Sequence, residues 1–279
     1  MNSLLRSGDY ARKQLYCPSA VVRWSHGSRF ELAQRLAAAR AGGRVLDYGC
    51  GDGTFVAMVH GDFREAVGWD VDPGQIGECR RRLGQLPGVR FEVVPNAVTS
   101  HPAASGWDVV TCMEVLEHCL DAERRRVLDR LASLVRADGL VLISVPIEIG
   151  PSVAGKQLFR AIAGLRNAGD YRHRERYSPF EMLQSMLGRR VRRVSFEGRG
   201  ADGPYRYHGH KGFDYRELAR EIAERFTIRE RLFSPMPWLG PILNSQVWFV
   251  CGIKARSAPE SDALREGCAA AGRAVPRLR

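Results

Sequence analysis

Three glycines at alternate positions constrain the fold of this chain more than any other feature. Residues 45–55 read VLDYGCGDGTF, so an apolar run that predicts a short strand leads into Gly49, Gly51 and Gly53. A helical run predicted over 54–60 follows directly. Glycine lets the backbone turn sharply and approach a ligand closely, because it has no Cβ. A strand, a glycine-rich turn and a helix in this order predict an α/β fold with a ligand at the turn.

Two carboxylates accompany the glycines. Asp47 ends the predicted strand and Asp52 lies inside the turn. The N-terminus of the next helix offers N–H groups to an electron-rich ligand, but carboxylates repel a pyrophosphate. The turn therefore suits a ligand with an ammonium or sulfonium group better than a phosphate-led one. The dinucleotide pattern G-x-G-x-x-G also fails here, because position 54 is Thr.

Two later segments extend the pattern. A second strand predicted over 64–69 is followed by Asp70, an acidic residue placed to accept hydrogen bonds from ribose hydroxyls. Asp72, just before Pro73, has the position of a helix N-cap. A fourth strand is predicted over 107–112, and the sequence MEVLEH follows it.

These motifs resemble one family. D-x-G-x-G-x-G after a first strand is similar to motif I of the class I S-adenosylmethionine (SAM) dependent methyltransferases. The pattern W-D-V-V-x-x-x-E-V-L-E-H at 107–118 resembles the same family, especially its small-molecule O-methyltransferases of the ubiquinone-biosynthesis type. The resemblance implies SAM as cofactor. Its methionine part would be held by Asp47, Gly49, Gly51 and Gly53, and its ribose by Asp70. Its adenine would be held by Asn96 and Ala97, and its sulfonium end would be flanked by Met113 and Glu114. Asn96 stands where the family usually has Asp, and its carbonyl oxygen can still accept from the adenine amino group.

The expected architecture is a Rossmann-like seven-stranded α/β sheet with an antiparallel last strand and an inserted lid after strand five. We expect an N-terminal cap segment at 1–42 and a methyltransferase domain at 43–254. A lid is inserted in that domain at 147–211, and a disordered tail follows at 255–279. Further strands are predicted over 89–94, 140–145, 226–233 and 245–254, and helices over 29–39, 121–136 and 213–225. The aromatic residues and histidine of the cap segment either line a pocket or cover the sheet edge; they are Tyr10, Tyr16, Trp24 and His26.

The basic charge of the chain is concentrated in the predicted lid. Residues 151–211 carry a net charge of +8 of the total +11, whereas residues 1–150 are neutral overall. Segments after the carboxyl end of a strand lie over the ligand crevice of an α/β sheet. A basic lid there predicts a small acidic substrate; a solvated face or an anionic surface is the alternative.

Candidate substrate and catalytic residues come mainly from the same segment. We expect Tyr171, His173 and Tyr205 to contact the substrate. His208, His210 and His118 are the candidate bases, with a buried structural role as the alternative for His118. His208 and His210 are spaced like metal ligands, but no third ligand is evident, so no metal is predicted.

The favoured function is O-methylation of a small acidic or glycan-, lipid- or quinone-like metabolite. An RNA-modifying methyltransferase and a SAM-binding regulatory protein without turnover are the alternatives. Nucleic acid is disfavoured as a partner, because strand four is followed neither by an Asn/Asp-Pro-Pro-aromatic turn nor by Pro-Cys. The acceptor, the methylated atom and the oligomeric state stay open.

Cysteine usage and hydropathy bear on location. The seven cysteines are scattered, with no C-x-x-C pair, which predicts reduced thiols in a cytoplasmic protein. No signal pattern and no apolar run of the roughly 18–20 residues needed for a membrane span is present. The apolar loop 235–241 is interpreted as packing, with substrate or peripheral membrane contact as alternatives.

Overall fold

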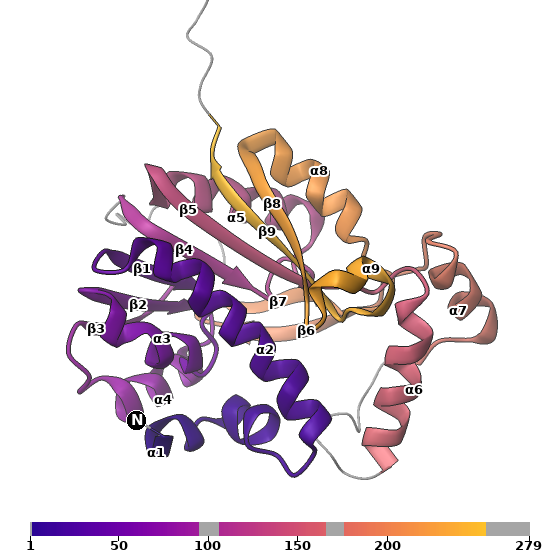
Figure 1. Cartoon of the computed structure of the whole chain (residues 1–279), viewed down its shortest axis with the longest axis horizontal. Coiled ribbons are helices and arrows are strands. Elements are labelled where there is room, and N and C mark those ends of the chain that lie inside the picture. Colours follow the sequence, from indigo (N-terminus) through magenta and orange to yellow (C-terminus); the bar gives the residue numbers. More distant parts are fainter. Residues whose placement is uncertain (1, 95–105, 166–175, 255–279) are drawn as a thin grey trace, which may run out of the picture.

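A seven-stranded sheet forms the centre of the protein (Figure 1). The computed structural model describes residues 2–94, 106–165 and 176–254. The strands lie in the order β3-β2-β1-β4-β5-β9-β8, with bounds β1 (Arg44–Tyr48), β2 (Glu65–Asp70), β3 (Val89–Val93), β4 (Trp107–Met113), β5 (Val135–Pro146), β8 (Phe226–Ser234) and β9 (Gln246–Ile253). Strands β1 to β5 are parallel, and β9 runs antiparallel to both of its neighbours. The predicted Rossmann-like sheet with an antiparallel last strand is confirmed.

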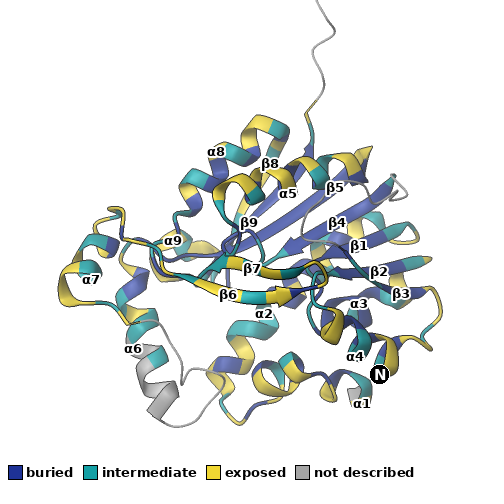
Figure 2. Cartoon of the chain, turned by 180° about the vertical axis from the view of Figure 1, so that it is seen from behind, coloured by how far each residue is buried: buried dark blue, intermediate teal, exposed yellow. Residues whose placement is uncertain are grey.

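Helices cover both faces of the sheet. Helices α2 (Ala20–Ala37), α3 (Thr54–Val59) and α4 (Pro73–Leu83) lie on one face, and α5 (Asp121–Leu134) and α8 (Tyr215–Arg225) lie on the other (Figure 1). Strand β1 shows why the sheet is sandwiched: Val45 packs into one core and Leu46 into the other. Parallel strands buried on both faces need apolar residues at successive positions. Figure 2 shows that the central strands of the sheet are buried along most of their length.

Local capping sets where several elements begin. Helix α2 begins at Ala20 because the Ser19 side chain accepts a hydrogen bond from the Val22 N–H. The helix predicted over 29–39 therefore begins nine residues earlier than predicted, and the predicted start was wrong. Asp72 caps α4, as predicted, by accepting from the N–H groups of residues 74 and 75.

The N-terminal segment packs against the glycine-rich turn. It contains α1 (Asn2–Arg6) and a π-helix, η1 (Ala11–Leu15). The Asp52 carboxylate accepts hydrogen bonds from the N–H groups of Tyr10 and Ala11 at 3.0 and 3.2 Å. Asp52 therefore attaches this segment to the turn. Two short 3-10 helices complete this half of the fold, η2 (Ala38–Arg40) and η3 (His60–Asp62).

The segment between β5 and α8 lies across the carboxyl ends of the strands. It contains α6 (Ser152–Leu165), α7 (Pro179–Met186) and a separate hairpin of β6 (Ser195–Gly200) and β7 (Gly203–His208). The Ala201 N–H donates to the Val71 carbonyl beyond β2, and the His208 N–H donates to the His118 carbonyl beyond β4. The segment thus borders the predicted crevice; its action as a lid stays a prediction.

The loop 235–241 between β8 and β9 contains η4 (Pro237–Leu239) and the start of α9 (Gly240–Leu243). The Trp238 side chain in this loop is 79% exposed, so the packing role that we expected for the loop is wrong for this side chain. The described cysteines are all buried and form no disulfide with one another. Within the described ranges, no helix has the length and apolar character to cross a bilayer. The tail 255–279 lies outside the described residues.

Gly53 tests how strongly the turn depends on glycine. Its φ is +72°, and an added Cβ would lie 2.8 Å from the Phe91 ring and 2.9 Å from Leu83. We expect Gly53→Ala to lower the free energy of unfolding by at least about 2 kcal/mol, since left-handed backbone and crowding both oppose it. Urea denaturation measures the change.

Gly27→Ala is the matched control, because Gly27 lies inside α2 with open space around it. This substitution should raise stability by about 0.5–1 kcal/mol. Equal effects of the two substitutions would contradict the account of the turn.

Candidate cofactor and acceptor site

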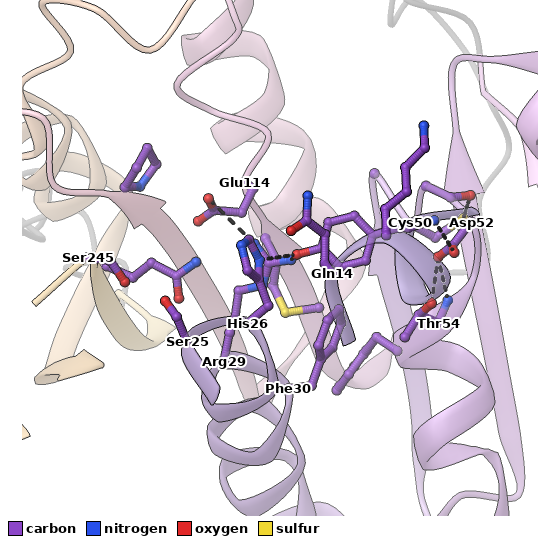
Figure 3. Close-up of a pocket in the computed structure, with 18 of the residues that line it drawn as sticks. Gln14, Ser25, His26, Arg29, Phe30, Cys50, Asp52, Thr54, Glu114 and Ser245 are labelled. Atoms are coloured by element: carbon purple, nitrogen blue, oxygen red, sulfur yellow. Dashed lines mark hydrogen bonds and ion pairs between the residues drawn. The ribbon is translucent and has the colours of Figure 1, made fainter. Parts of the chain in front are cut away.

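Two adjoining cavities open at the carboxyl ends of the parallel strands. The larger has a volume of about 560 Å³ and the smaller about 350 Å³. Both are lined by Gly49, Gly51, Gln75, Glu114 and His118. The shared lining makes them two chambers of one elongated site, which Figure 3 shows from the side of the larger chamber. Ligands of open α/β sheets bind at this edge.

Five N–H groups of the glycine-rich turn and the helix start, those of residues 49, 50, 51, 53 and 54, are used inside the protein. Gly51 donates to the Asp70 carboxylate at 2.9 Å, and Thr54 donates to the Asp52 carboxylate at 3.1 Å. The N–H groups of Gly49 and Cys50 donate to the Trp69 carbonyl, and that of Gly53 donates to the Cys50 carbonyl. The expectation that the N-terminus of this helix offers N–H groups to a ligand is wrong for Thr54, the first helical residue, and stays a prediction for residues 55 and 56. A turn without these donors suits a phosphate group poorly.

Asp70 lies in the smaller chamber, at the end of β2. Its two carboxylate oxygens accept hydrogen bonds from the N–H groups of Gly51 and Asp72, both at 2.9 Å. Burial raises the pKa of Asp70, and these two hydrogen bonds oppose that shift. The carboxylate is thus held rigidly at the chamber wall, with lone pairs left over for a ligand.

Asp47 lies in the larger chamber and is only 2% exposed. Its carboxylate accepts a hydrogen bond from the Thr111 hydroxyl at 2.6 Å. Burial raises the pKa of Asp47 to about 7, because the charged form loses hydration. A cation in the chamber would therefore favour the ionised carboxylate.

Glu114 lines both chambers and has a strained backbone conformation. Its φ is +58°, which is rare for a residue with a Cβ and is typical of functional positions. One carboxylate oxygen lies 3.5 Å from Arg29 Nη1, and the other has no hydrogen-bond partner among the described residues. Met113, the residue before it, lines the larger chamber.

Arg29 is a site residue that the sequence did not reveal. Its buried guanidinium donates to the Tyr10 hydroxyl, which in turn lies 2.6 Å from His26 Nδ1 (Figure 3). Arg29 Nε is buried without a hydrogen-bond partner among the described residues. The sequence does hold one sign of this role: Arg29 lies on the same face of the helix as the buried Ala33, where an apolar residue is expected. A buried guanidinium at a chamber wall can hold a carboxylate.

A second missed group lies at the far end of the larger chamber. Glu148, which follows β5, is fully buried and accepts from Lys156 Nζ at 2.7 Å and Arg160 Nη2 at 2.8 Å. Burial raises the pKa of Glu148, but the two cations outweigh it and lower the pKa to about 2. Lys156 and Arg160 line the chamber, so the basic segment does contribute cations to it.

The structure brings two of the three candidate catalytic histidines together. His118 lines both chambers and His210 lines the larger one, with their ring centroids 4.7 Å apart. The ring of His208 lies 3.0 Å from the Ser195 hydroxyl and lines neither chamber.

The remaining predicted residues are distributed as follows. Tyr205 lines the smaller chamber, on the side of Asp70. Asn96, Ala97, Tyr171 and His173 lie outside the described residues. From the cap segment, Tyr10 and His26 line the larger chamber, whereas Tyr16 and Trp24 line neither.

Comparison with known proteins gives the family and agrees with the fold. A family model described as a methyltransferase domain matches residues 23–189, more than half of the chain. The chain belongs to the class I SAM-dependent methyltransferase family, and SAM is its cofactor. The chemistry of the lining fits that cofactor: Asp47 and the guanidinium of Arg29 line the larger chamber, and Asp70 lines the smaller one.

Curated relatives match parts of the chain, and a solved structure shares its fold. A ubiquinone biosynthesis O-methyltransferase of Salmonella paratyphi A is 36% identical over 107 residues, which are 37% of this chain and 42% of that protein. One of Vibrio cholerae is 26% identical over 199 residues, which are 69% of this chain and 75% of that protein. The match to the Salmonella protein therefore covers less than half of that protein's length. The N-methyltransferase NodS of Bradyrhizobium japonicum, crystallised with S-adenosylhomocysteine, shares the fold with a TM-score of 0.53, 13% identity and coverage of 90% of this chain and 97% of NodS.

Asp70 is expected to hold the cofactor by charge-assisted hydrogen bonds. Replacing Asp70 with Asn should weaken SAM binding about 10- to 100-fold, the range for losing hydrogen bonds to a charged group. Isothermal titration calorimetry measures the affinity. Asp62→Asn, an exposed position in η3, is the control and should bind as wild type. Unchanged affinity of the Asp70 variant would remove this residue from the site.

Asp47 gives the cofactor affinity a specific pH dependence. Its pKa is about 7 in the free protein, and a cationic ligand lowers that pKa, so binding below pH 7 releases a proton. SAM affinity should therefore fall as the pH drops below 7, by up to about tenfold per pH unit, and level off above 7. Calorimetry in buffers of different ionisation enthalpy counts the proton. Asp47→Asn should abolish both the release and the slope; an unaltered slope in this variant would show that another group titrates.

Proposed function

We propose that the chain transfers the methyl group of SAM to a hydroxyl oxygen of a small acidic metabolite. One observation carries the proposal: the smaller chamber holds the Asp70 carboxylate, the larger chamber holds the cations Lys156 and Arg160, and His118 lines both chambers. The similarity to ubiquinone biosynthesis O-methyltransferases supports oxygen as the acceptor atom.

The cofactor-end residues have distinct roles in this proposal. Bound SAM supplies an electrophilic methyl group on a positively charged sulfur. Asp70 accepts hydrogen bonds from the ribose, and Arg29 binds the carboxylate of the methionine part. Asp47 faces the positive charge from within the larger chamber. The apolar side chains of Val71, Val94 and the ring of Tyr205 line the smaller chamber, where a flat base packs well.

The other end of the larger chamber positions the acceptor. Lys156 and Arg160 share the buried carboxylate of Glu148, so this group of three carries one net positive charge. An acidic group of the acceptor is held there while its hydroxyl points toward His118 and His210. Because SAM already carries a good leaving group, alignment of acceptor and cofactor is the main contribution of the protein.

Arg160 provides the test of acceptor charge. We expect Arg160→Ala to raise KM for 3,4-dihydroxybenzoate about tenfold or more, by loss of a charge-assisted contact, and to leave KM for catechol nearly unchanged. Release of S-adenosylhomocysteine and the mass of the methylated product are measured by chromatography and mass spectrometry. Arg190→Ala is the control, because Arg190 is exposed and lines neither chamber.

Other outcomes would favour the alternative functions. An equal change of KM for both phenols would contradict the anion-holding role of Arg160. Methylation of RNA with steeply salt-dependent binding would support the RNA-modifying alternative. Cofactor binding without release of S-adenosylhomocysteine for phenolic acids, catechols or RNA would support the regulatory alternative.

A further inference from the structure

Three side chains with metal-binding groups converge where the two chambers meet. They are Glu117, His118 and His210, and their ligand atoms lie within 4.8 Å of one another. Glu117 and His118 belong to the turn after β4, and His210 follows β7. The sequence shows no third ligand next to His208 and His210, because the partners of His210 come from a distant segment.

Glu117 is the least explained polar side chain of this cluster. It is fully buried, and neither of its carboxylate oxygens has a hydrogen-bond partner among the described residues. An ionised carboxylate that is buried without a partner is strongly unfavourable unless a cation compensates it. Arg193 donates to the main-chain carbonyls of Glu117 and Gly209, which fixes the backbone on both sides of the cluster.

The His118 imidazole is oriented as a metal-bound histidine usually is. His118 Nδ1 lies 2.8 Å from the carbonyl oxygen of His208, so it carries the proton and donates. Nε2 of His118 is then left with its lone pair, and it lies 3.8 Å from the Glu117 carboxylate. A hydrogen bond from the remote ring nitrogen to a carbonyl is the common outer-shell contact of a metal-bound histidine. In His210, the buried Nδ1 has no hydrogen-bond partner within the described part of the chain.

We propose that Glu117, His118 and His210 bind one divalent first-row transition-metal ion at the boundary of the chambers. Two imidazoles and one carboxylate suit ions such as Zn²⁺ or Mn²⁺ better than Ca²⁺, which prefers oxygen ligands alone. Three protein ligands leave coordination positions open, as in catalytic rather than structural sites. These positions lie at the larger chamber, which His118 and His210 line.

The role of the ion rests on the proposed function and narrows the acceptor class. A hydroxyl oxygen bound to a divalent ion has a lowered pKa, so its proton passes to water and the oxygen stays bound as an anion. Two neighbouring hydroxyls bind such an ion through both oxygens. The site therefore favours an acceptor with vicinal hydroxyl groups, such as a catechol, that also carries an acidic group.

Metal binding is tested on the full chain without reference to activity. The protein is treated with EDTA, dialysed and titrated with ZnCl₂ and MnCl₂ by calorimetry, with elemental analysis of the bound ion. We expect one ion per chain, bound at least about tenfold more weakly by His118→Ala and by His210→Ala. His208→Ala is the matched control, because its ring contacts Ser195 and its main-chain carbonyl is kept. Metal binding equal in all four proteins would indicate an adventitious ion only and overturn the site.

A second variant separates metal binding from folding. Glu117→Gln keeps the side-chain volume and removes the buried charge, so the metal-free variant should unfold at the same or a higher temperature than metal-free wild type. It should bind the ion at least about tenfold more weakly while SAM affinity stays within about threefold. Unchanged metal affinity of this variant would overturn the proposal. Methyl transfer by the EDTA-treated, metal-free protein would refute the role of the ion in the reaction alone, whereas metal binding without methyl transfer would refute the proposed function alone.

Discussion

The hydrogen bond from the Gly51 N–H to the Asp70 carboxylate is the contact on which the site depends. It joins the turn after β1 to the end of β2, and the N–H groups of Gly49 and Cys50 reinforce it by donating to the Trp69 carbonyl. The turn is left-handed at all three glycines, so it needs residues without a Cβ to make these contacts. Through Asp52 the same turn also holds the N-terminal segment that carries Tyr10. One short turn thus positions both walls of the cofactor chambers.

The distribution of charge follows from that arrangement. The turn uses its N–H groups internally and presents the carboxylates of Asp47 and Asp70, so it favours a positively charged ligand over a phosphate. Arg29 is the nearby cation, and it is held by Tyr10 and Glu114 from two different elements. At the far end, Lys156 and Arg160 reverse the sign of the charge. A ligand with a cationic centre and an acceptor with an anionic group can therefore lie end to end.

The sequence predicted the sheet and the cofactor turn because both depend on local patterns. Apolar strands, alternating glycines and the cap at Asp72 are encoded within a few neighbouring residues. Arg29, Glu148 and the grouping of Glu117 with His210 depend on contacts between distant segments, and no local pattern marks them. The wrong start of α2 has the same kind of cause. Ser19 and Ser28 are equally good caps by residue type, but Ser19 caps α2 and the helix continues through Ser28.

Determining where S-adenosylhomocysteine lies in a crystal of the complex tests the central claim most directly. We expect ribose hydroxyls within about 2.5–3.0 Å of the Asp70 carboxylate oxygens. The homocysteine part should follow the turn at 49–53, with its carboxylate at Arg29. A ligand bound elsewhere, or a ribose that makes no contact with Asp70, would contradict the account.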